Sequence, residues 1–160
     1  MAVGLVMVEI LDKTTQAMDN SEILFRLIQK SLLTLDSQEL NNLIILLFYK
    51  VQFAKYSGFN PIPEFCNHCN KTLNQAYYNP QNGFLFCTNC INMDGLELPE
   101  IIFQMLKKLS VTHIDELNSI EINSDSILTI EKYLTQFMIY HLNGMYNIKS
   151  LKFLNEVFSS

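Results

Sequence analysis

The chain has 160 residues, of which 49% are apolar and 17% charged, and its formal net charge at pH 7 is −5. This length corresponds to one domain with a substantial core, and the composition excludes an intrinsically disordered chain. Lysine and arginine together number 11, and Arg26 is the only arginine. Because nucleic-acid-binding proteins neutralise phosphates with basic surfaces, strong DNA binding by this chain alone is not favoured.

The apolar segments do not indicate export or membrane insertion. The first eleven residues are apolar but lack a basic start, and Glu9 interrupts them. The longest apolar run, Leu43 to Tyr49, ends at Lys50 and is far too short to span a bilayer. A cytoplasmic protein without a membrane partner is therefore expected.

Helical spacing dominates the first part of the chain. Residues 1–11 are ambiguous, because their valines suit a strand whereas the neighbouring segments suggest a helix. A helix is predicted after Asn20 or Ser21, with Leu24, Leu27, Ile28, Ser31 and Leu35 on one face. A second helix is predicted over residues 38–57, with Gly58 as its C-terminal cap. Because its middle is apolar on every face, it should be the central helix.

The second part combines a hairpin with further helices. Two short strands, 76–78 and 84–86, are predicted around a turn-rich linker that contains Asn-Gly. Helical patterns follow after Pro99, and then at 113–117, 125–142 and from Ser150 through Leu151, Leu154, Val157 and Phe158. The expected fold is mainly α: one helical domain over 1–160, interrupted at 62–95 by a four-cysteine zinc-finger subdomain with a small β hairpin.

All four cysteines occur in two Cys-x-x-Cys pairs, Cys66 with Cys69 and Cys87 with Cys90. Two residues between thiolates let one tight turn aim both sulfurs at one point, and 17 residues separate the pairs. This spacing is typical of a structural zinc site with four cysteine ligands. We therefore predict one structural Zn²⁺ held by these residues.

Other uses of the cysteines fit less well. Two disulfides need an oxidising compartment, and a redox Cys-x-x-Cys needs one pair beside a strand–helix unit. Iron–sulfur ligation stays open as a minor alternative. His68, between the first two ligands, is expected to face solvent, and His113 and His141 are interpreted as structural residues.

No catalytic motif accompanies the metal site. A centre closed by four thiolates has no open position for an activated water. The sequence contains no Gly-rich phosphate loop, no GxSxG and no HExxH, and no cysteine is left over as a nucleophile. The acidic pairs Asp115–Glu116 and Glu97/Glu100 are interpreted as solvated surface. The chain is therefore not expected to be an enzyme.

The order of these features resembles a known family. Helices lead into Gly58-Phe-Asn-Pro61 and Cys66-x-x-Cys69, and an aromatic stretch leads into Asn82-Gly83-Phe-Leu-Phe-Cys87. The chain then closes with further helices and Lys149-Ser150. This order is similar to the C-terminal part of RecO, the bacterial recombination mediator, and the resemblance extends over nearly the whole chain.

The chain also departs from that family. Asn70 and Asn82 stand where members often carry glycine, and asparagine tolerates left-handed backbone better than most residues. RecO proteins begin with an oligonucleotide-binding barrel, and no such strand-rich, basic segment precedes the helices. The chain is therefore expected to be a truncated piece or a degenerate relative, with weak DNA binding.

The resemblance implies a non-enzymatic role in recombination and repair by the RecF pathway, in the bacterial cytoplasm near the nucleoid. RecO-like proteins act with RecR and single-stranded DNA-binding protein, help to load RecA and anneal strands. The acidic, Phe-ending tail of single-stranded DNA-binding protein needs an apolar slot with a cationic rim. The candidate cations are Arg26, Lys30, Lys107, Lys108, Lys149 and Lys152.

Two other functions stay open from the residues alone. One is a zinc-ribbon adaptor for protein interactions, for example in transcription, without a link to recombination. The other is a helical scaffold in which the metal site is only a staple.

Overall fold

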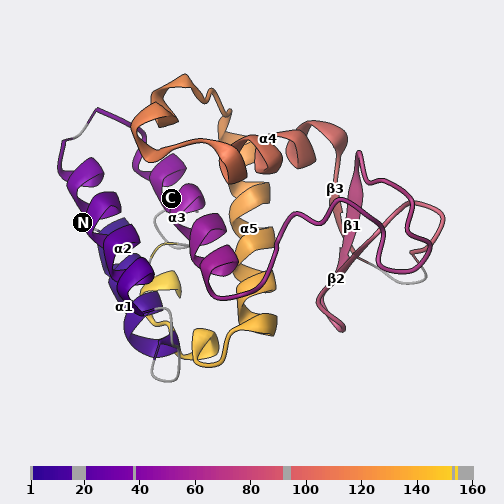
Figure 1. Ribbon diagram of the computed structural model, residues 1–160, viewed down its shortest axis with the longest axis horizontal. Helices are drawn as coiled ribbons and strands as arrows, with labels where there is room; N and C mark the ends of the chain where they lie inside the picture. The colour runs from indigo at the N-terminus through magenta and orange to yellow at the C-terminus, as the bar shows by residue number, and fades with distance from the viewer. Residues whose placement is uncertain (1, 16–20, 38, 92–94, 153, 155–160) are drawn as a thin grey trace.

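The computed structural model describes residues 2–15, 21–37, 39–91, 95–152 and 154. The protein is mainly helical, with a three-stranded antiparallel sheet at one end of the molecule beside α5 (Figure 1). The described elements, in chain order, are α1 Ala2–Thr14, α2 Ser21–Asp36, α3 Asn42–Tyr56, β1 Ala76–Asn79, β2 Phe84–Phe86, β3 Leu96–Leu98, α4 Glu100–Val111, the 3₁₀ helix η1 Ile114–Ser119, α5 Ser124–His141 and the 3₁₀ helix η2 Met145–Asn147. The mainly α class predicted from the sequence is confirmed.

The ambiguous N-terminal segment is a helix, α1. Val3, Val6, Met7 and Ile10 are buried, at the spacing of three and four residues that one helix face requires. This face packs against α2 and α3. The strand preference of the valines is a weak local signal, and the burial of this stripe overrides it.

Helix α3 forms the centre of the bundle, as its apolar middle predicted. Every residue from Ile44 to Ala54 is buried, and α3 packs against α1, α2, α4 and α5. The helix begins at Asn42 because the side chain of Asn41 accepts a hydrogen bond from the Leu43 amide at 2.9 Å. At the other end Gly58 has φ of +92°, the left-handed conformation expected of a C-terminal glycine.

The core around α3 contains one charged pair. The ammonium group of Lys50 is fully buried and donates hydrogen bonds to the Glu131 carboxylate and to Thr135 Oγ1 on α5. Burial lowers the pKa of Lys50, and the opposing effect of Glu131 does not cancel this change. A buried ion pair is a weak source of net stability, but it joins the two helices in one register.

The remaining helices close the bundle. Helix α5 begins after Asn123, whose side chain accepts a hydrogen bond from the Ser126 amide at 2.8 Å. The short helix predicted at 113–117 is a 3₁₀ helix, Ile114–Ser119, whose Ile114 and Leu117 are buried. Gly144 has φ of +95° and follows the end of α5, as the Asn-Gly signal predicted.

The sheet has the order β2-β1-β3. The predicted hairpin is confirmed, with Tyr77 opposite Phe86 and Asn79 opposite Phe84. The third strand, β3, was not predicted. It pairs antiparallel with β1 and leads directly into α4, so the sheet is joined to the bundle at a second point.

Helix α1 contacts the segment around residues 149 and 150. The carboxylate of Glu9 on α1 accepts hydrogen bonds from the backbone amides of Lys149 at 3.0 Å and Ser150 at 2.9 Å. These amides begin a helical segment that includes residues 150–152 and 154, in agreement with the predicted helix start. Val157 and Phe158, which were predicted to belong to the same helix, lie outside the described residues. Glu9 therefore caps a helix that lies more than a hundred residues away in sequence.

Candidate metal centre

The first Cys-x-x-Cys pair lies in a tight turn between Phe65 and Thr72, which form an isolated antiparallel bridge. The Cys66 amide donates to the Lys71 carbonyl at 2.8 Å, and the Asn70 amide donates to the Cys66 carbonyl at 3.1 Å. Asn70 has φ of +57° and is the one described residue other than glycine with a positive φ. Asn70 thus adopts the left-handed conformation that asparagine tolerates better than most residues, as predicted.

The second pair follows β2 and is joined to the first by backbone hydrogen bonds. The Asn67 amide donates to the Leu85 carbonyl at 3.1 Å, and the Cys87 amide donates to Cys66 Sγ at 3.3 Å. The Cys90 amide closes its own turn on the Cys87 carbonyl at 3.0 Å. The hairpin therefore places the two turns face to face.

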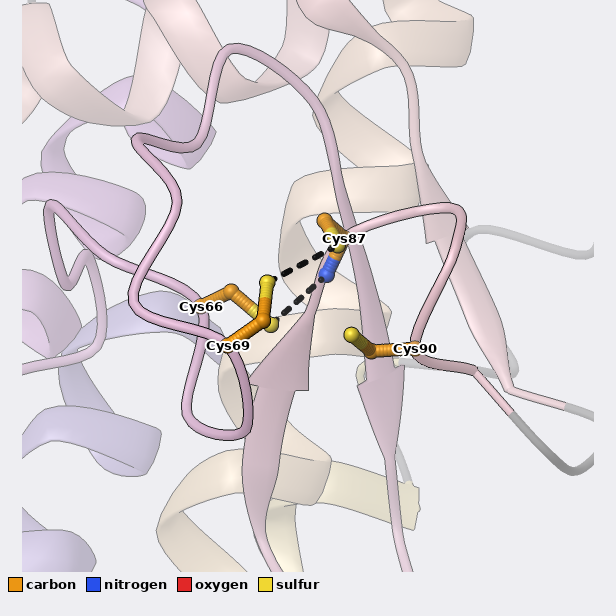
Figure 2. Close-up of side chains that lie close together, drawn as sticks. All are labelled: Cys66, Cys69, Cys87 and Cys90. Carbon is orange, nitrogen blue, oxygen red and sulfur yellow. Dashed lines mark hydrogen bonds between the residues drawn. The ribbon is translucent and has the colours of Figure 1, made fainter.

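The four sulfur atoms converge on one point, as Figure 2 shows. All four Sγ atoms lie within 4.8 Å of one another, and the Cys69 and Cys87 Sγ atoms are 3.6 Å apart. A zinc ion at about 2.3 Å from four thiolates requires sulfur–sulfur distances of about 3.8 Å. This geometry is compatible with a structural metal ion held by Cys66, Cys69, Cys87 and Cys90.

The thiols differ in their tendency to ionise. Burial raises the pKa of Cys66, but hydrogen bonds from the backbone of Cys69, Cys87 and His68 outweigh it and lower the pKa to about 6. Hydrogen bonding to Cys69, followed by burial, raises the pKa of Cys90 to about 12. The Cys66 thiol therefore ionises more readily than the Cys90 thiol. A bound divalent cation favours the thiolate form of each cysteine that it binds.

The cysteine-bearing segment, residues 61–91, packs on the helical bundle through specific polar contacts. The Tyr78 hydroxyl donates to the Gln136 carbonyl at 3.2 Å, and the Tyr133 hydroxyl donates to the Pro61 carbonyl at 2.5 Å. The Tyr78 and Tyr133 rings meet edge to face, with centroids 5.2 Å apart. Because both rings are fully buried, the sheet and α5 share one core.

The hairpin turn makes a second contact with the end of α5. Gly83 has φ of +73°, and a Cβ there would lie 2.2 Å from the Tyr140 ring, so only glycine fits. The Gly83 carbonyl lies 2.9 Å from His141 Nε2, which donates because a carbonyl can only accept. Asn82 does not adopt the left-handed conformation expected for it. Its side chain instead accepts a hydrogen bond from the Phe84 amide at 3.1 Å and forms an Asx turn.

None of the three histidine side chains belongs to the group of potential metal ligands among the described residues. His68 is exposed, as predicted, and His113 is exposed in front of η1. His141 holds the hairpin turn, which agrees with a structural role. Nothing in its sequence surroundings indicated the partner, because Gly83 lies 58 residues away.

Two of the six predicted cations, Arg26 and Lys30, line a hollow of about 630 Å³ between α2, α3 and the end of α4. Apolar side chains, among them Ile23, Leu27 and Val111, line the same hollow. A third cation on its lining, Lys55 of α3, was not predicted, because only the folded bundle brings α3 beside α2. Its Nζ donates to the Ser110 carbonyl at 2.8 Å.

The other four lysines lie elsewhere. The ammonium group of Lys107 donates to the Leu73 carbonyl and lies 4.9 Å from the Phe103 ring centroid, and that of Lys108 donates to the Ser119 carbonyl. Lys149 and Lys152 lie in the C-terminal segment that Glu9 caps. The structure therefore does not bring the six cations together.

Within the described residues, no helix combines the length and the apolar character needed to cross a membrane.

Known proteins match this chain over almost its full length. The family model "Recombination protein O C terminal" matches residues 1–152. A protein named DNA repair protein RecO from Thermoanaerobacter sp. strain X514 is 26% identical over 151 residues, covering 93% of this chain and 60% of the relative. Proteins of the same name from Oceanobacillus iheyensis and Bacillus pumilus are 23% and 26% identical, and the matches cover 94% of this chain and 58% and 59% of the relatives.

The chain thus spans about 60% of the length of the curated relatives that it matches. The four-cysteine cluster and the mainly helical fold of this chain had both been expected from its residues. With the family model matching residues 1–152, the chain belongs to the RecO C-terminal family.

Proposed function

We propose that this chain is the helical, metal-binding part of a recombination mediator, which acts in recombinational DNA repair through contacts with proteins and not by catalysis. Membership of the RecO C-terminal family supports this proposal, as do relatives whose printed name is DNA repair protein RecO. Cooperation with a RecR-like protein, help in RecA loading and strand annealing belong to the same proposal. DNA binding by this part alone would be weak, because the net charge is −5.

The proposed metal is one structural Zn²⁺, with Cys66, Cys69, Cys87 and Cys90 as ligands. Four thiolates in two Cys-x-x-Cys turns are the usual donor set of a structural zinc ion. We further propose that residues 62–95 form an inserted subdomain that this ion holds together. When bound, the ion supplies cross-linking and no catalysis, because all its positions are filled by sulfur.

The observation that carries the partner proposal is the hollow between α2, α3 and α4. Its rim bears the cations Arg26, Lys30 and Lys55, and its lining includes Ile23 and Val111, both substantially exposed. Arg26 pairs with Glu22 on the surface, and such an exposed pair exchanges readily for another carboxylate. An apolar slot with a cationic rim suits an acidic peptide that ends in an aromatic residue. The proposed occupant is therefore the tail of single-stranded DNA-binding protein.

The test is a titration of the 160-residue chain with a fluorescent acidic peptide that ends in phenylalanine. Lys30→Glu should weaken binding roughly tenfold, because a charge reversal at the rim repels the peptide, and added salt should reduce the difference. Val111→Glu should weaken binding by a similar factor, because it places a negative charge on the apolar part of the lining. Removal of the terminal phenylalanine should abolish the effect of Val111→Glu.

Matched controls come from lysines outside the hollow. Lys132 is exposed on α5, so Lys132→Glu changes the net charge equally but should leave peptide binding almost unchanged. Lys149→Glu tests the two C-terminal candidates, Lys149 and Lys152. Lys108→Glu tests the two candidates on α4, Lys107 and Lys108. Equal losses for Lys30→Glu and Lys132→Glu would show non-specific attraction and contradict the proposed site.

A further inference from the structure

A second hollow lies between the cysteine-bearing segment and the bundle, and its chemistry differs from that of the first. Its volume is about 270 Å³, and its lining comes from the loop after α3, the first cysteine turn, the hairpin and the last turns of α5. The lining contains no lysine, arginine, aspartate or glutamate. A charged ligand group would therefore find no counter-charge inside.

The walls of this hollow are aromatic. Phe65 and Phe84 belong to the cysteine-bearing segment, and their side chains are 48% and 44% exposed. The back wall contains the ring of His141, which contacts the tilted rings of Phe137 at 4.3 Å and Phe59 at 5.1 Å between centroids. Two exposed rings facing a fixed aromatic wall suit the faces of a planar, uncharged ring system.

The lining also contains hydrogen-bonding groups. The side-chain oxygen of Asn60 accepts from the Ile62 amide at 3.0 Å, which leaves its NH₂ group to act as a donor. Asn67 adds an exposed carboxamide, which can both donate and accept. An aliphatic or phenyl side chain could form no hydrogen bond with these two groups, whereas a heteroaromatic ring with polar edges could.

Stacking rings combined with carboxamides are the groups by which proteins hold unpaired nucleobases. We propose that this hollow takes a single unpaired base of single-stranded DNA, stacked on Phe84, with its polar edge toward Asn60 and Asn67. This inference rests on the proposed role in DNA repair and assigns a separate site to it. The phosphates stay outside, so the contribution of this site is insensitive to salt.

The metal centre shapes this site. Phe65 and Asn67 flank the ligand Cys66, and the Asn67 amide is bonded to Leu85 of the hairpin. The opposite wall is fixed to the hairpin by the His141–Gly83 hydrogen bond. The two walls of the hollow are thus held at a set distance by the turn that the metal closes.

The test uses the 160-residue chain with a labelled oligothymidylate and an abasic oligonucleotide of the same length. The abasic strand keeps the phosphates and removes the bases. Wild type should bind the oligothymidylate roughly tenfold more tightly than the abasic strand, because only the oligothymidylate has a base to stack on the aromatic wall. Phe84→Ala should lose this preference while its salt dependence stays unchanged.

The controls separate this site from other effects. Phe25→Ala removes an exposed ring from α2 and should keep the full preference, and thermal unfolding with metal content shows whether Phe84→Ala is folded. Phe84→Ala should bind the acidic peptide like wild type, so a failure of the peptide site remains distinguishable. The proposal is overturned if wild type does not bind the oligothymidylate or if the abasic strand binds equally well. It is also overturned if Phe84→Ala weakens only peptide binding, because that result would assign the hollow to a protein side chain.

Discussion

The buried pair between Lys50 and Glu131 gives a sharp prediction about the bundle. The side chains are 0% and 9% exposed, so neither charge has water as an alternative partner. Glu131→Gln removes the counter-charge and keeps the size of the side chain. Breaking such a pair from one side costs about 3–5 kcal/mol, because the remaining charge stays buried without compensation.

This loss is a large part of the total stability of a domain, which is about 5–15 kcal/mol. It corresponds to a fall of roughly 6–20 °C in melting temperature for a chain of this size. The pH dependence has a defined sign. Burial lowers the pKa of Lys50, and Glu131 opposes this effect, so the variant should have a still lower pKa. Because the unfolded chain then binds the additional proton, the stability of the variant should rise as pH rises above neutral.

The assay is urea unfolding of wild type, Glu131→Gln and the double variant Lys50→Met/Glu131→Leu. Replacing both charges with apolar side chains should restore most of the lost stability, because no uncompensated charge remains. Lys132→Gln, on the exposed side of the same helix, is the matched control and should change little. A loss below about 1 kcal/mol for Glu131→Gln would refute the reasoning, since that is the value of an exposed pair. A double variant as unstable as the single variant would refute it as well.

Two further predictions concern the metal and the chain ends. Cys66→Ser should release the metal and loosen the hairpin while the helices persist, because Cys66 is the buried ligand. Metal analysis and circular dichroism measure the two effects. A variant that retains a full equivalent of zinc would contradict this prediction. Glu9→Gln should cost about 1–2 kcal/mol at neutral pH in urea unfolding. Burial raises the pKa of Glu9, but the hydrogen bonds from Ser150 and Lys149 bring this pKa below its ordinary value of 4.5. The stabilisation by the Glu9 carboxylate is therefore complete above pH 4.5 and is lost as the pH falls through the pKa of the folded state. A difference that persists in strong acid would argue against the cap.

The parts of the fold that were predictable are those with local causes. The Cys-x-x-Cys turns, the Asn-Gly hairpin and the central apolar helix each depend on residues close in sequence, and all three are present. Asn70 is another example, since its left-handed backbone follows from the turn itself. Local patterns of this kind are informative wherever spacing alone decides the structure.

The parts that were not predictable depend on distant neighbours. The strand β3 is only three residues long, and it exists because β1 offers a free edge. The valines of α1 were ambiguous until α2 and α3 covered them. Lys55 joins Arg26 and Lys30 only through the packing of α2 on α3. A single sequence contains no signal for such pairings.

The docking of the cysteine-bearing segment explains why a metal ion is useful in this fold. A segment of fewer than about 40 residues rarely buries enough apolar surface to fold alone. The cysteine-bearing segment contributes few core residues of its own, chiefly Leu73, Tyr78 and Leu85. Of these, Tyr78 contacts α5. A cross-link between the two cysteine turns therefore replaces the missing core. Because those turns carry Phe65 and Asn67, the same cross-link sets the shape of the surface that the segment presents beside α5.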